Sequence, residues 1–236
     1  MPRANRTKVL FLAVLATVVL SNLPVVRYLL YPLLLFATWV HEMCHGLMAI
    51  ALGGRFQTLV INPDTSGLAT YLADFGSIRR GLVASAGYLG TTLFGAGLVA
   101  AQASRRTARI ALFGIGATLL LSVLLWVRNP FGIVTCLLLG VGFLLLARKV
   151  DERWHPFLLT YLGAQTCLNG LMSIRVLYGV TSHGHSDANT MADLFWLPHW
   201  VWATLWLALS VGALVMALRI EDRRERSRAD WPSLEI

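Results

Sequence analysis

The sequence predicts an all-α polytopic membrane protein with about six to seven transmembrane helices and a small β-hairpin after the second helix. Hydrophobic residues make up 56% of the 236 residues and charged residues only 14%, whereas a soluble domain carries roughly a quarter charged residues. The mean hydropathy is +0.64. Uncharged apolar runs long enough to cross roughly 30 Å of hydrocarbon recur along the chain. One segment of different character, with strand and turn residues, interrupts them.

The first two apolar runs are each expected to form one membrane helix. The run over roughly residues 8–23 follows three basic residues and has no small-x-small cleavage site. We therefore expect a retained helix there and not a removed signal peptide. The second run, roughly residues 28–52, ends at Gly53-Gly54, and glycines of this kind commonly end helices.

The segment from Arg55 to Gly76 has the chemistry of a β-hairpin. Partial alternation and β-branched residues flank a turn at Asn62-Pro63-Asp64, with Gly67 just beyond. Within a membrane, non-helical backbone is tolerated only where protein or a wet cavity satisfies its polar groups. We therefore expect this hairpin at the membrane interface or beside a cavity.

Five further helices are expected after the hairpin. The first of them is rich in glycine and alanine, which allow helices to approach closely in lipid. The expected ranges are roughly 79–101, 108–127, 131–147, 156–179 and 199–218, with a polar loop at 181–189. These boundaries predict a single transmembrane domain over residues 1–218 and a charged C-terminal tail over residues 219–236.

The net charge of +8 does not indicate a nucleic-acid partner. The basic residues lie at the edges of the apolar runs, at the N-terminus and after Leu218. This placement is typical of membrane anchoring and of contacts with anionic headgroups. We therefore expect the lipid bilayer as a partner and no nucleic acid. The oligomeric state has no signature in the sequence.

The second helix carries His-Glu-Met-Cys-His at residues 41–45, a pattern that fits a catalytic metal site. His41 and His45 lie four residues apart, so a helix projects both imidazoles from one face, close enough to share one zinc ion. In this arrangement, Glu42 takes a proton from the attacking water and can deliver it to the leaving amine. Ionisable groups in an apolar helix are costly in lipid, which favours function over satisfaction by neighbouring helices.

A catalytic zinc needs a third protein ligand that lies far away in the sequence. Asp187 lies in a polar stretch between long helices, which a folded bundle can bring back to the second helix. Asp64 is the alternative, but an Asn-Pro-Asp turn already explains an aspartate there. We predict Asp187 as the metal ligand. The weaker candidates are Asp74, Asp193, His183 and His185.

Asn169 is a further polar residue within an expected membrane helix. An asparagine near zinc could hold the backbone of an extended substrate or an oxyanion. The alternative is a hydrogen bond between helices.

The sequence resembles the site-2-protease-like intramembrane zinc metallopeptidases, and most closely their compact bacterial peptidase-family-like branch. The resemblance rests on His-Glu-x-x-His in an early membrane helix, Gly-Gly-Arg after it, and a Pro-Asp-x-x-Gly turn. It continues in Ala-Gly-x-Leu-Gly at Ala86–Gly90 and in Ser186-Asp187-Ala188, with Pro198 and Trp202 beyond. The matching region spans about Trp39 to Trp206. A Leu-Asp-Gly motif found in other members is missing.

The resemblance implies a zinc metalloprotease of a bacterial plasma membrane, with zinc on His41, His45 and a distal aspartate and Glu42 as catalytic base. Its expected activity is intramembrane proteolysis, the hydrolysis of peptide bonds in or near transmembrane segments of a membrane-protein or peptide substrate. Two alternatives stay open at this stage. One is a non-proteolytic metal-binding membrane protein, such as a transporter subunit or a scaffold with a degenerate site. The other is a zinc protease that processes the termini of lipid-modified proteins.

Overall fold

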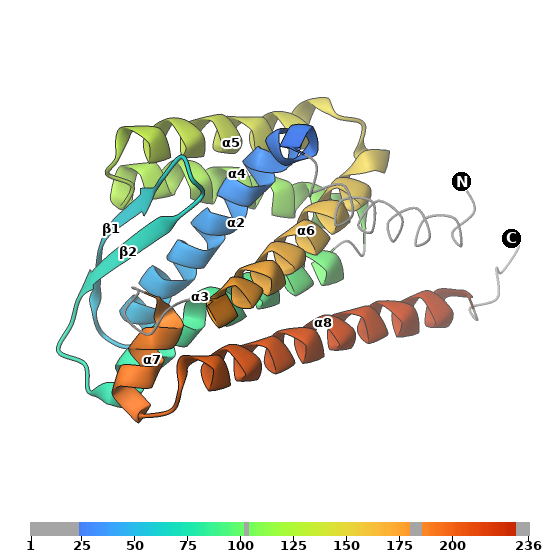
Figure 1. Cartoon of the computed structure of the whole chain (residues 1–236). Coiled ribbons are helices and arrows are strands. Elements are labelled where there is room, and N and C mark those ends of the chain that lie inside the picture. The colour runs from blue at the N-terminus through green and yellow to red at the C-terminus, as the bar shows by residue number, and fades with distance from the viewer. Residues whose placement is uncertain (1–23, 102–103, 180–185, 230–236) are drawn as a thin grey trace, which may run out of the picture.

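The computed structural model describes residues 24–101, 104–179 and 186–229 as a bundle of long helices with one β-hairpin. Figure 1 shows α4 and α5 together on one side of the bundle and α8 on the other, with α2, α3 and α6 between them. The elements are α2 (Pro24–Ala51), β1 (Arg55–Ile61), β2 (Gly67–Leu72), α3 (Ser77–Ala101), α4 (Arg105–Leu125), α5 (Pro130–Lys149), α6 (His155–Val176), α7 (Asp187–Phe195) and α8 (His199–Ala229). The helices and the hairpin confirm the predicted fold class.

Five of the described helices are long and apolar enough to cross a membrane, so the chain is an integral multi-pass membrane protein. The candidate spans are Tyr28–Ala51, Ser77–Ala101, Arg105–Leu125, Pro130–Lys149 and His199–Met216. Helix α6 is not among them, because polar residues such as Gln165 and Asn169 lower its mean hydropathy. The helix expected at residues 8–23 lies outside the described residues.

The last helix is longer than its apolar part. The candidate span ends at Met216, but α8 remains helical to Ala229. It therefore crosses the boundary at residue 218 that separated the expected domain from the charged tail. Charged residues from Arg219 onward end the apolar run without ending the helix, because most of them are Arg or Glu, which are good helix formers.

Close contact between α3 and α6 confirms the expectation drawn from the small residues of α3. A Cβ atom on Gly95 would lie 2.6 Å from the carbonyl oxygen of Gly163, and one on Gly163 would lie 2.6 Å from the carbonyl oxygen of Gly95. The two backbones therefore approach at a point where neither helix has a side chain. This packing fixes α6 and the chain that follows it relative to the centre of the bundle.

The hairpin is antiparallel, and the outer edge of β1 is closed by the connection between α4 and α5. The Leu59 amide donates to the Trp126 carbonyl at 2.8 Å, and the Arg128 amide donates to the Leu59 carbonyl at 3.2 Å. The Asn129 side chain accepts from the Ile61 amide and donates to the Ile61 carbonyl. Strand β1 is thus hydrogen-bonded on both sides, which leaves β2 as the free edge.

Candidate metal centre

His41 and His45 lie one turn apart on α2 and direct their ring nitrogens to the same point. Their Nε2 atoms are 3.0 Å apart, and the ring centroids are 4.7 Å apart. Both side chains are largely buried, with 19% of the His41 side chain and 9% of the His45 side chain exposed. As expected from the i, i+4 spacing, both imidazoles project from one face of the helix and lie close enough to share one ion.

Asp187, the first residue of α7, brings a carboxylate to both imidazoles. Its Oδ2 atom lies 3.3 Å from Nε2 of His41 and 3.2 Å from Nε2 of His45. Ser186 caps α7 by accepting a hydrogen bond from the Asn189 amide, which fixes where the helix begins. Burial alone would raise the pKa of Asp187, but the two imidazoles hold this pKa well below its usual range. The group is therefore a carboxylate, the form that binds metal.

Helix α3 packs directly against the rings of His41 and His45. The Nδ1 atom of His45 lies 2.7 Å from the Val83 carbonyl oxygen, so this nitrogen carries the proton and Nε2 is left as the ligand atom. A Cβ atom on Gly87 would lie 2.3 Å from Nε2 of His45 and 2.5 Å from Nε2 of His41. Only glycine lets α3 approach the two rings so closely.

Three potential ligand atoms, one each from His41, His45 and Asp187, lie within 4.8 Å of one another. Two imidazole nitrogens and one carboxylate oxygen are a ligand set that zinc accepts in catalytic sites, with the fourth position left for water or substrate. The Val83 carbonyl provides the outer hydrogen bond that metal-binding histidines usually make. The residues present therefore fit a zinc ion.

Glu42 lies beside this group but is not part of it. The side chain is only 7% exposed, and its carboxylate accepts a hydrogen bond from the backbone of Ala69 in β2. A Cβ atom on Gly67 would lie 2.7 Å from Oε1 of Glu42. The hairpin thus holds the carboxylate next to the metal ligands without making it one of them.

A cavity of about 1160 Å³ opens onto these groups. It is lined by residues of α2, β2, α3, α6 and α7 and by none of β1. Leu30, Leu33 and Leu34 of α2 make its wall apolar away from His41 and Glu42, while Gln165 and Asn169 line it from α6. This confirms that the hairpin lies beside a cavity, one of the two positions expected for it.

The other candidate ligands do not reach the centre. Asp64 is exposed at the hairpin tip, where it accepts hydrogen bonds from the amide and hydroxyl of Ser66, which hold its pKa below the usual range. Neither Asp74 nor Asp193 belongs to a group of metal-ligating side chains in the described ranges. His183 and His185 lie outside the described residues.

Residues of α3 contribute more to the centre than the sequence indicated. Val83, Gly87 and Tyr88 all contact a histidine of the metal group. Gly87 belongs to the Ala-Gly-x-Leu-Gly motif, so a signal was present, but small residues in a membrane helix are equally explained by helix packing. Val83 acts through its main chain, which leaves no trace in the sequence.

Comparison with known proteins identifies the family of the chain. Residues 9–217 match the protein family described as Peptidase M50B-like. The chain belongs to this family. The match includes α2, the hairpin, α3 and α7, and therefore every residue of the metal group. As an M50B-like protein, the chain is a member of a membrane peptidase family. Neither the curated proteins nor the solved structures contain a match.

Proposed function

We propose that this M50B-like protein is a zinc-dependent intramembrane endopeptidase that hydrolyses peptide bonds in or near transmembrane segments of membrane proteins, in the plasma membrane of a bacterium. The observation that carries the proposal is the meeting of His41, His45 and Asp187 at one point of a membrane helix bundle, with Glu42 beside them. All four side chains line the same cavity. A peptide in that cavity would meet metal ligands and a general base together.

His41, His45 and Asp187 would hold the zinc ion. When bound, zinc lowers the pKa of a coordinated water to about 7 and polarises a substrate carbonyl. Glu42 is the base that accepts the proton of the attacking water, and it returns a proton to the nitrogen of the leaving amine. Glu42 is only 7% exposed, and the Ala69 amide keeps its carboxylate oriented.

The substrate must present an extended backbone, because helical hydrogen bonds shield the carbonyls of a folded transmembrane segment. Strand β2 offers the partner for such a backbone. The N–H and C=O groups of Leu59 point away from β2, toward the α4–α5 connection. Those of its antiparallel partner Ala69 therefore point away from β1. This edge of β2 therefore faces the cavity. The Ala69 amide holds Glu42, so strand addition of an unwound substrate would use the Ala69 carbonyl and the main chain of Gly67 on the same edge.

Helix α6 supports the opposite side of such a substrate. Gln165 is only 4% exposed, and its Nε2 atom has no hydrogen-bond partner among the described residues. Asn169 lies one turn further along the same helix and lines the same cavity. An extended peptide has polar groups on both edges, and in the membrane both edges need partners. We assign Asn169 and Gln165 to the edge that β2 does not reach.

A non-proteolytic metal protein is the competing function, and Glu42 argues against it. A structural or transported metal needs ligands but no buried base held beside them by a hairpin. The test is a comparison of the wild-type chain with Glu42→Gln, purified in detergent, with zinc measured by elemental analysis and cleavage measured on single-pass membrane proteins. We expect about one zinc per chain in both proteins and cleavage lowered by roughly two orders of magnitude or more in the variant. Zinc binding without cleavage in the wild-type chain would favour the non-proteolytic function.

A further inference from the structure

Tyr88 of α3 lies directly against a metal ligand. Its ring meets that of His41 edge to face, with 4.6 Å between the centroids and 80° between the planes. The other neighbour of this ring is Trp206 of α8, which stacks on it at 5.1 Å and 20°. Tyr88 is therefore held between the metal group and a helix that otherwise contributes nothing to the cavity wall.

The hydroxyl of Tyr88 is available for a ligand. The residue is only 9% exposed and lines the cavity, and its hydroxyl makes no hydrogen bond to another residue in the described part of the chain. The carboxylates of both Asp187 and Glu42 act on it electrostatically, which places it near the two acidic groups of the centre. This hydroxyl is not sealed from the cavity, so a ligand in the cavity is the partner to which it can donate a hydrogen bond.

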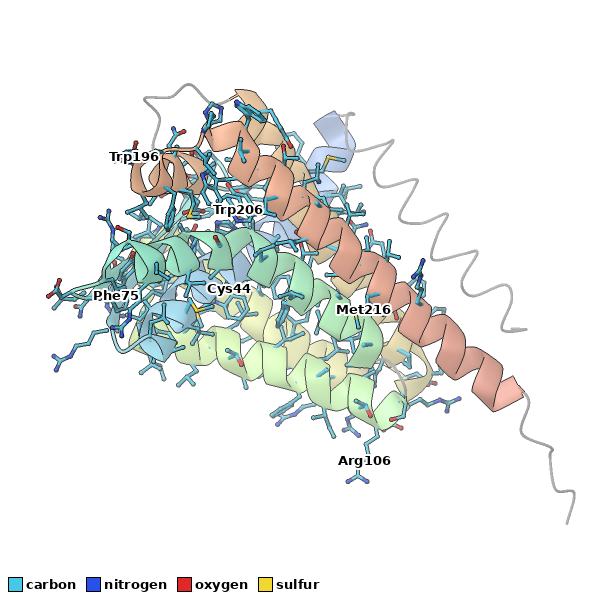
Figure 2. All side chains as sticks on the ribbon, turned by 90° about the horizontal axis from the view of Figure 1, so that it is seen from below. Cys44, Phe75, Arg106, Trp196, Trp206 and Met216 are labelled. Atoms are coloured by element: carbon cyan, nitrogen blue, oxygen red, sulfur yellow. The ribbon has the colours of Figure 1, made fainter. Side chains whose placement is uncertain are left out.

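Trp206 fixes the direction of this phenol. The indole is 1% exposed, and its Nε1 atom donates to the Ser85 hydroxyl at 3.1 Å. Figure 2 shows Trp206 on the side of α8 that faces α3 and α7. The Tyr88 ring is held by Trp206 on one side and by His41 on the other, so little conformational entropy is lost when its hydroxyl donates to a ligand. Such preorganised donors are the ones that stabilise developing charge effectively.

We propose that Tyr88 is a catalytic residue that donates a hydrogen bond to the oxyanion formed from the scissile carbonyl. This inference rests on the proposed function. In the step concerned, the water oxygen bonds to the carbonyl carbon, the C=O π electrons move to the carbonyl oxygen, and Glu42 accepts the water proton. The Tyr88 hydroxyl donates to that oxygen and keeps its own proton. The C–N bond then breaks as Glu42 protonates the nitrogen, and the carbonyl forms again.

Tyr71 is the alternative phenol, since it also lines the cavity and is influenced by Asp187. It extends from β2, however, and its ring packs against Phe75, with 5.9 Å between the centroids. Among the described contacts, only the Tyr88 ring touches a histidine of the metal group. We therefore assign Tyr88, and not Tyr71, to the reacting carbonyl.

The experiment compares two peptide inhibitors of the same sequence on Tyr88→Phe. A phosphinic peptide carries a tetrahedral anion that imitates the transition state, and a mercaptoacyl peptide binds zinc through sulfur without an oxygen at that position. The substitution keeps the ring between His41 and Trp206 and removes only the hydroxyl. We expect unchanged zinc content, phosphinic peptide affinity lowered by about 10- to 100-fold, and mercaptoacyl peptide affinity changed by less than about twofold. The kcat should fall by a similar factor while KM stays the same.

Tyr178→Phe is the matched control, because this hydroxyl pairs with Thr204 at 2.9 Å outside the cavity. Its affinities should equal those of the wild-type chain. If Tyr88→Phe weakens both peptides equally, or if Tyr71→Phe and not Tyr88→Phe weakens the phosphinic peptide, the assignment is wrong. A wild-type chain that binds neither peptide and cleaves nothing would overturn the proposed function, and the role of Tyr88 with it.

Discussion

Gly67 and Glu42 touch across the gap between the hairpin and α2. A Cβ atom on Gly67 would lie 2.6 Å from Cγ of Glu42 and 2.7 Å from Oε1, closer than such atoms can approach. The first residue of β2 therefore limits where the proposed base can lie. By the same contact, the hairpin is part of the proposed catalytic arrangement as well as a wall of the cavity.

Gly67→Ala should impair cleavage without removing zinc. The new methyl group must displace the Glu42 side chain, and a displacement of about 1 Å can cost about 100-fold in rate. The measurement is kcat on any cleaved membrane protein, together with zinc per chain. Gly76→Ala is the control, since a Cβ atom there meets nothing within 4 Å. Equal rates for the two variants would show that this contact does not position the base.

Gly87→Ala should reduce zinc binding, because its Cβ atom would occupy the space of both imidazoles. We expect zinc per chain well below one after purification, measured by elemental analysis. Gly97→Ala on the same helix is the matched control, because a Cβ atom there meets nothing within 4 Å. Full zinc content in Gly87→Ala would mean that α3 can move away from the two imidazoles and that the prediction is wrong.

Asp187→Ala should weaken zinc binding, and Asp64→Ala should not. Loss of a group that merely orients a metal ligand costs roughly 10- to 100-fold in affinity, and loss of a ligand should cost more. Competition with a zinc-binding dye measures both constants. Among the described residues, Asp64 pairs with Ser66 in the hairpin tip, so its loss should leave zinc affinity at the wild-type value. The reverse order of the two variants would remove Asp187 from the metal group.

A photo-crosslinking amino acid at position 68 should capture substrate, and one at position 57 should not. Leu68 is 56% exposed in β2 and lines the cavity. Gln57 is also exposed, but it lies in β1, whose residues do not line the cavity. The probe is a single-pass membrane protein that the wild-type chain cleaves, held in the Glu42→Gln background. Equal capture at the two positions would contradict strand addition at β2.

A proline substitution in β1 is not a test of strand addition, because β1 is the strand that pairs with β2 inside the hairpin. Proline at Val60 would remove a main-chain donor from β1. Because Leu59 faces the α4–α5 connection, its neighbour Val60 faces β2. Such a change would break the hairpin itself before it affected any substrate. A test of substrate binding therefore belongs on β2.

Much of the molecule follows from local sequence patterns. The long apolar runs determine the membrane helices, because lipid leaves the backbone no other way to satisfy its polar groups. Asn62-Pro63-Asp64 and the alternation around it determine the hairpin. The spacing of His41 and His45 determines that two imidazoles share a helix face, since this geometry is intrinsic to a helix.

Only the tertiary structure decided which residues from different helices and strands come into contact. The distance of Asp187 from the histidines depends on how α6, α7 and α3 pack, which no local pattern encodes. The closing of β1 by Asn129 and the main-chain support of His45 by Val83 are likewise contacts between segments far apart in the sequence. The sequence by itself therefore determined the helices and the shared helix face of His41 and His45. The sequence also predicted Asp187 as the third ligand, but only the fold shows its carboxylate beside both imidazoles. The free edge of β2 and the position of the Tyr88 phenol likewise depend on long-range packing.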